Sequence, residues 1–106
     1  MKLNEYQQEA RETAIYPEEL GLLYTTLGLA GESGEVAEKV KKMIRDGTSL
    51  EDCRESLINE LGDVLWYVAN LAHELKTTLE EVAFVNLDKL KDRQAREVLK
   101  GSGDAR

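Results

Sequence analysis

The sequence predicts an all-α fold, a bundle of about four helices that is completed by oligomerisation. Apolar residues recur at helical spacing along most of the chain, and no stretch shows the alternation typical of strands. Proline occurs once, whereas the helix formers Leu, Glu, Lys and Ala are abundant. With 106 residues there is room for a single domain, residues 1–106, with a modest core. We therefore expect a partner subunit to cover the apolar faces of the longest helices.

The first helix is expected to begin at Asn4, with Gln7 three residues further on as its capping-box partner. It should end near Tyr16, because Pro17 disfavours helical geometry in the residue before it. Pro17 itself suits the first turn of a second helix, and the two acidic residues after it would lie at the positive end of that helix.

The second helix is expected to be long and to end at Gly47. Gly28, Gly31 and Gly34 interrupt its apolar pattern, and each glycine costs up to about 1 kcal/mol relative to alanine in a helix. Three glycines within about a turn and a half therefore indicate a close approach of backbone or ligand, or a local break in the helix.

Two further helices complete the predicted bundle. Ser49 precedes the third helix, and Thr78 with Glu81 forms a capping box that opens the fourth, which runs through Leu90. Residues from about 94 to 106 include a glycine-rich stretch and are expected to form an irregular tail.

The charge of the chain limits its partners. Fourteen basic and 21 acidic side chains give a net charge of −7, which disfavours binding to nucleic-acid backbones. The single cysteine, Cys53, agrees with a reducing compartment. Because no apolar run is long enough for a membrane span or a signal-peptide core, we expect a cytoplasmic protein without nucleic-acid or membrane partners.

Two acidic pairs lie beside the apolar stripes of neighbouring helices. With Glu32 at zero on a helical wheel, the valine four positions on lies at about 40° and Glu35 at about −60°. The same construction places Glu60 at zero and Asp63 at about −60° on the next helix. Each helix therefore presents an i, i+3 carboxylate pair in the same position relative to the core.

Four carboxylates at the edge of a core need a counter-charge, because burying them unpaired would cost many kcal/mol or force their protonation. Mg²⁺ prefers oxygen ligands and keeps positions for water or phosphate, so the four acids predict a magnesium site. A solvated acidic face, or a structural ion pair between Glu32 and Lys39, remains an alternative.

A di-iron bundle would also carry glutamates inside helices, but it needs two Glu-x-x-His motifs. The chain has one histidine, His73, and Asn70 stands three residues before it. This absence of nitrogen ligands excludes a di-iron site and most zinc chemistry.

Two segments resemble a known family. Residues 27–36 read LGLAGESGEV, and residues 59–67 read NELGDVLWY. These segments resemble the MazG-like nucleotide pyrophosphohydrolases of the all-α NTP pyrophosphatase superfamily, whose signature is E-x-x-E followed by E-x-x-D on the next helix. The resemblance covers nearly the whole chain, from Tyr6 to the tail.

The resemblance implies Mg²⁺-dependent hydrolysis of a (deoxy)nucleoside triphosphate between its α and β phosphates, giving the monophosphate and pyrophosphate. Such a reaction serves to clean the nucleotide pool. The four matching acids would bind magnesium, and one of them would activate the attacking water. Family members are commonly dimers or tetramers with sites completed across subunits, which implies a homodimer or homotetramer.

Other residues are candidates for binding the substrate. In the family, residues matching Asn86, Lys89 and Arg93 reach the triphosphate, and helical spacing places all three within about 60° of arc. A solvated basic face is the alternative. Trp66, on the flank of its helix, can stack on a base or pack in a core or interface. Lys39 is a further possible phosphate donor.

The tail, GSGDAR, also looks family-like, but the family pattern has Gly where Glu97 stands and Asn where Ala105 stands. These departures leave a catalytic part for the tail open. Two other functions are compatible with the sequence: a phosphoribosyl-ATP pyrophosphohydrolase, and a catalytically silent helical module for oligomerisation or regulation.

Overall fold

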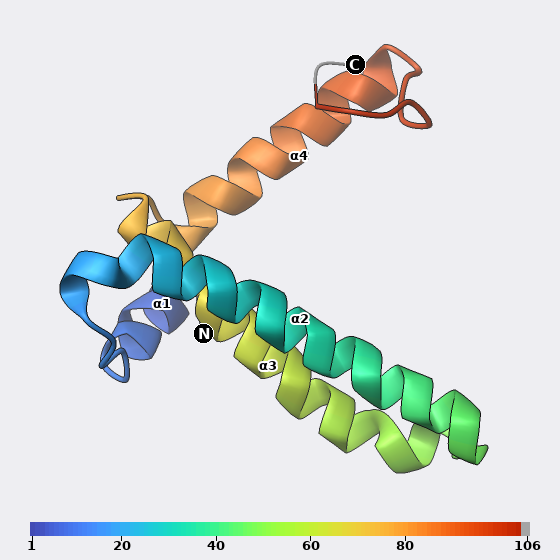
Figure 1. Cartoon of the computed structure of the whole chain (residues 1–106). Coiled ribbons are helices and arrows are strands. Elements are labelled where there is room, and N and C mark those ends of the chain that lie inside the picture. Colours follow the sequence, from blue (N-terminus) through green and yellow to red (C-terminus); the bar gives the residue numbers. More distant parts are fainter. Residues whose placement is uncertain (105–106) are drawn as a thin grey trace.

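A computed structural model describes residues 1–104, and it is all-α with four α-helices and no strand in this range, as the sequence predicts. The elements are α1 (Leu3–Arg11), the 3-10 helix η1 (Glu18–Leu20), α2 (Gly21–Asp46), α3 (Leu50–Glu74) and α4 (Leu79–Ala95). Helices α2 and α3 form a long antiparallel hairpin, α1 lies across its open end, and α4 extends away from it (Figure 1). Among residues 1–104, α4 packs against α1 and α3 but not against α2.

The predicted end of α2 and the predicted starts of α3 and α4 are confirmed. Gly47 ends α2 in the left-handed conformation, with φ of 66°, which a residue without a side chain adopts most readily. The Ser49 hydroxyl accepts a hydrogen bond from the backbone N–H of Asp52, and the Thr78 hydroxyl accepts one from that of Glu81. Short-range capping patterns therefore predict these boundaries correctly.

The predicted end of α1 is wrong. The helix ends at Arg11 rather than near Tyr16, and the next residues turn back toward the hairpin. There the Arg11 guanidinium donates a hydrogen bond of 2.6 Å to the Tyr16 hydroxyl, and the Tyr16 ring stacks on Tyr24 at 4.9 Å. Pro17 then precedes η1 instead of opening α2 directly. Tertiary contacts of Tyr16 override the local preference for a longer helix.

Asn4 and Gln7 do not form the predicted capping box of their own helix. Instead they cap α4: the Asn4 side-chain oxygen accepts a 3.0 Å hydrogen bond from the N–H of Glu80, and that of Gln7 accepts one from Leu79. With the Thr78 cap, the first three N–H groups of α4 all have side-chain acceptors. These bonds set the direction in which α4 leaves the hairpin.

The glycine-rich part of α2 shows a close approach and no break, since the helix is continuous from Gly21 to Asp46. A Cβ atom at Gly28 would overlap the ring of Tyr67 from α3, so only glycine allows the two helices to lie so close here. At Gly31 and Gly34, in contrast, a Cβ would meet no described atom within 4 Å.

The tail begins slightly later than predicted, because α4 continues to Ala95. Glu97, where the family resemblance led us to expect glycine, adopts a φ of 59°, a conformation that favours glycine. The other departure, Ala105, lies outside the described residues.

The chain is more extended than a compact domain of its length. Its radius of gyration is 16.6 Å, whereas roughly 13 Å is usual for this size. Its accessible surface is 7986 Å², whereas a monomer of 11.9 kDa would expose roughly 5,900 Å². The buried apolar core among the described residues is small: Ala10, Ala69, Ala72 and Leu79. Large apolar side chains on α2, α3 and α4 are consequently exposed.

None of the helices in the described part of the chain combines the length and the apolar character that a membrane span requires.

Candidate functional site

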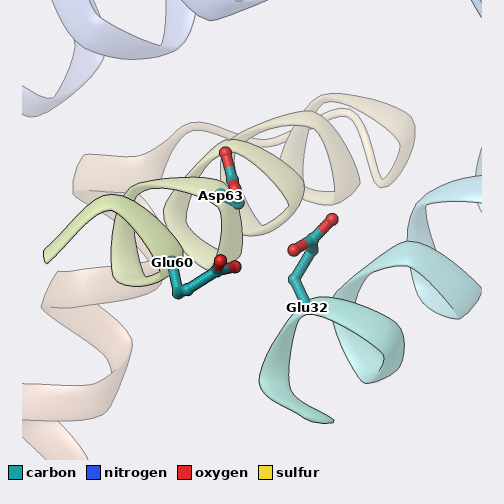
Figure 2. Close-up of side chains that lie close together, drawn as sticks. All are labelled: Glu32, Glu60 and Asp63. Carbon is teal, nitrogen blue, oxygen red and sulfur yellow. The ribbon is translucent and has the colours of Figure 1, made fainter. Parts of the chain in front are cut away.

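Three of the four predicted acids converge between the hairpin helices. Glu32 extends from α2 toward Glu60 and Asp63 on α3, as Figure 2 shows. Each of the three carboxylates offers an oxygen, and these oxygens lie within 4.8 Å of one another. Glu35, one turn further along α2, is exposed and does not belong to this group in the described structure. The acidic group therefore has three close members and one neighbour.

The electrostatics of Glu32 reflect this crowding. Desolvation raises its pKa above the ordinary value, and the negative charges of Asp63, Glu60 and Glu35 raise it further. Glu35 thus lies close enough for its charge to act on Glu32. Like charges held together in this way are stabilised by a proton or by a bound cation.

Lys39 supplies a positive charge at the edge of the group. Its ammonium lies 3.5 Å from a carboxylate oxygen of Glu60, so the ion pair joins α2 to α3 rather than involving Glu32 as the alternative interpretation had it. One lysine faces three close carboxylates, and the group keeps a net negative charge.

A cleft of about 320 Å³ opens beside the acids. It is lined by Thr13, Glu32, Asp63, Trp66 and Tyr67. The indole N–H of Trp66 donates a 2.8 Å hydrogen bond to the Thr13 hydroxyl, and its ring meets Tyr67 edge-on at 4.9 Å. Trp66 is therefore held in a fixed orientation in the wall of a cleft whose floor is acidic.

Tyr67 lies close to the line of Glu60 and Asp63 on the helical wheel, so the sequence leaves open whether it contacts substrate or simply packs. Burial raises the pKa of Tyr67, and so do a hydrogen bond with Tyr24 and the charges of Tyr24, Glu32 and Asp63, which keeps its phenol neutral and able to donate. Thr13 was not among the predicted site residues. Thr13 lies on the turn after α1, where no pattern points to it.

The basic residues of α4 form a separate group in the single chain. Lys89 and Arg93 both contact the carboxylate of Asp104, at 2.9 Å and 3.0 Å, and Asn86 lies exposed on the same helix. Because α4 extends away from the hairpin, one chain does not bring these residues to its own acidic group (Figure 1). Their predicted contact with substrate stays a prediction.

The fold and this site define an all-α protein with a cluster of carboxylates suited to a hard divalent cation. Residues 20–97 match the MazG nucleotide pyrophosphohydrolase domain. The chain is also 48% identical over 114 aligned positions to the Gene 37 protein of Mycobacterium phage L5, and the alignment covers all of both chains. No solved structure matches the sequence. The chain belongs to the MazG nucleotide pyrophosphohydrolase family, which indicates a nucleotide pyrophosphohydrolase activity in general terms.

Proposed function

We propose that the protein hydrolyses a (deoxy)nucleoside triphosphate between the α and β phosphates, releasing the monophosphate and pyrophosphate. The observation that carries this proposal is the convergence of Glu32, Glu60 and Asp63, with oxygens within 4.8 Å of one another, at a cleft walled by aromatic rings. Cleaning of the cytoplasmic nucleotide pool is the role that such an activity would serve.

The acidic group fits Mg²⁺ by the chemistry of its donors. It offers carboxylate oxygens, and the raised pKa of Glu32, caused by desolvation and by the negative charges of Asp63, Glu60 and Glu35, supports the proposal of a bound cation. We propose Glu32, Glu60 and Asp63 as the close ligands, with Glu35 completing the site from the next turn of α2. Bound there, magnesium would neutralise charge on the phosphate oxygens and lower the pKa of a bound water.

The residues of the chain would position the substrate around this group. The orientation of Trp66, fixed by Thr13, gives a flat surface on which a base can stack. The neutral phenol of Tyr67 can donate a hydrogen bond to an oxygen of the nucleotide. One carboxylate of the group accepts a proton from the attacking water, which must approach the α phosphorus opposite the leaving pyrophosphate.

We propose that the phosphate donors Asn86, Lys89 and Arg93 act at the site of another subunit, in a homodimer or homotetramer. The chain exposes roughly 2,000 Å² more surface than a compact monomer of its mass, an excess within the range of stable interfaces. The exposed apolar side chains on α2 and α3, such as Leu27, Leu61 and Leu65, are the surface to be covered. Lys39, paired with Glu60, lies close enough to the acids to contact phosphate as well.

A screen for pyrophosphate release tests the activity. The purified chain is assayed against the eight common ribo- and deoxyribonucleoside triphosphates, each with Mg²⁺ and with a chelator. We expect magnesium-dependent release of pyrophosphate from at least one of them. In heavy-oxygen water, mass spectrometry should find the label in the monophosphate, beside unlabelled pyrophosphate. A nucleoside diphosphate with orthophosphate would show that a different bond is cleaved. No turnover of any substrate would favour a catalytically silent module.

A further inference from the structure

A carboxylate that contacts two cations at once joins α4 to the tail. A single oxygen of the Asp104 carboxylate lies 2.9 Å from the Lys89 ammonium and 3.0 Å from Nη2 of Arg93. The same Arg93 nitrogen also donates to the backbone carbonyls of Asp104, at 3.1 Å, and of Gly103, at 3.5 Å. Nη2 of Arg93 thus donates hydrogen bonds to three acceptor atoms of the tail.

This contact hides Arg93. Its side chain is only 5% exposed, although arginine is almost never buried without a partner, whereas the Asp104 side chain is 83% exposed. The tail segment 101–104 therefore acts as a cover over Arg93. A phosphate from another molecule cannot bind Nη2 of Arg93 while the tail carbonyls and the carboxylate occupy this nitrogen.

The Asp104 carboxylate binds the two cations as a phosphate group would, because one anionic oxygen accepts hydrogen bonds from both Lys89 and Arg93. The Asp104 side of the contact is open to water, since its side chain is 83% exposed and that of Lys89 is 36% exposed. Water screens the Lys89–Asp104 ion pair there, and the segment contains Gly101 and Gly103, which resist reorientation least. A nucleoside triphosphate carries several negative charges and can therefore displace a single carboxylate.

We propose that the tail is an internal competitor: Asp104 occupies the phosphate-binding pair Lys89 and Arg93, and substrate binds there only by displacing it. The proposal rests on the proposed role of this pair in triphosphate binding. The cations hold the pKa of Asp104 down to about 2, so its carboxylate stays charged at any physiological pH. The cover is thus released by a competing anion and not by a change of pH.

The test uses inorganic tripolyphosphate, so that it does not depend on turnover or on a nucleobase. Binding to the full chain is measured by calorimetry in a chelator, for the wild type and for Asp104→Asn. We expect Asp104→Asn to bind tripolyphosphate about two- to tenfold more tightly, because the competing ion pairs with both cations are lost. Asp92→Asn, which removes a carboxylate from an exposed pair with Arg96 on the same helix, controls for the change in net charge.

Proteolysis provides an independent readout. Trypsin can cleave after the exposed Lys100, at the base of the cover. Saturating tripolyphosphate should speed this cleavage in the wild type if it displaces the tail. A tail that positions Lys89 and Arg93 for substrate would instead be protected by the ligand, and Asp104→Asn would bind more weakly; either result overturns the proposal.

The same experiments separate this proposal from the proposed function. If no nucleotide is hydrolysed but tripolyphosphate binds more tightly to Asp104→Asn and releases the tail, the competitor is supported and the catalytic proposal fails. If neither the wild type nor Asp104→Asn binds tripolyphosphate, the competitor is wrong, because the pair is not a phosphate site. Tighter binding by Asp92→Asn to the same degree would also contradict it.

Discussion

The middle of the α2–α3 hairpin and the far end of α4 carry opposite charges and satisfy them in opposite ways. Three carboxylates crowd together in the hairpin, and their ion pair with Lys39 leaves them with a net negative charge. On α4, Lys89 and Arg93 are joined by a carboxylate from the same chain. The acidic region keeps a net negative charge, whereas the charges of Lys89 and Arg93 are partly neutralised by Asp104 of the same chain.

The difference teaches how the two regions are held. The acids come from two helices packed along their length, so the backbone fixes their mutual distance whether or not a cation is present. The basic residues come from a helix that is anchored only at its start, and their partner lies on an irregular tail. Under the proposed function, the acidic group is therefore in place before a cation binds, whereas the basic group must release Asp104 before it binds phosphate.

Removal of one acidic ligand should have the largest effect. We expect Glu60→Gln and Asp63→Asn to reduce magnesium-dependent turnover on the order of a hundredfold or more, since the stabilisation of charge by the metal is worth several kcal/mol. The metal-free fold should remain helical and gain in melting temperature, because one repelling charge is gone. Steady-state kinetics and thermal melts measure both effects, with Glu55→Gln on α3 as control. Wild-type turnover in both variants would contradict the metal site.

Lys89→Ala tests whether the basic residues of α4 bind the triphosphate. We expect a higher KM and a kcat/KM lower by about tenfold to a hundredfold, because a charge-assisted hydrogen bond to phosphate contributes roughly 1.5–3 kcal/mol. Magnesium affinity without nucleotide, measured by calorimetry, should stay unchanged. Lys91→Ala, which removes an exposed lysine of the same helix, is the matched control. A wild-type kcat/KM for Lys89→Ala would make this face a solvated surface.

Gln7→Ala tests the contacts that set the direction of α4 relative to the α2–α3 hairpin. The buried Gln7 side chain donates to the carbonyls of Ala69 and Thr77 and accepts from the N–H of Leu79. Its removal leaves these groups without that partner, so we expect a loss of about 2 kcal/mol in the free energy of unfolding. Urea denaturation measures it. Asn4→Ala, which removes an exposed cap of the same helix start, should lose less.

The smallest effect concerns the pH dependence of the metal-free fold. Because the pKa of Glu32 is raised above 4.5, the folded chain binds this proton more tightly than the unfolded chain. The free energy of unfolding should therefore fall as the pH rises from 4.5 through the raised pKa. Thermal melts in a chelator between pH 5 and 8 should show a slightly higher melting temperature at the acidic end. Glu32→Gln should flatten this trend, and saturating Mg²⁺ should remove it; a trend that Glu32→Gln leaves unchanged would assign it to other groups.

Local rules predicted the parts of the fold that depend on neighbouring residues. Ser49, Thr78 and Gly47 end or begin helices as their sequence context indicates, and the wheel placed Glu32, Glu60 and Asp63 on facing sides of two helices. Asn4 and Gln7 were misassigned because their true partners lie more than seventy residues away along the chain, at the start of α4.

The sequence could not predict how far the basic residues of α4 would lie from the acids. That separation depends on the direction in which α4 leaves its junction with α1, and three long-range or capping hydrogen bonds determine this direction. Asp104 was missed as the partner of Lys89 and Arg93 for the same reason, since an irregular tail has no periodicity from which its position can be calculated.

Gly28 affects the shape of the cleft indirectly, through its contact with Tyr67. The atom that is missing there lets the Tyr67 ring settle against the backbone of α2, and Tyr67 in turn supports the edge of Trp66. A single methyl group at position 28 would overlap the Tyr67 ring and force this wall of the cleft to shift. A substitution at a residue that does not itself line the cleft would thus change the shape of the cleft.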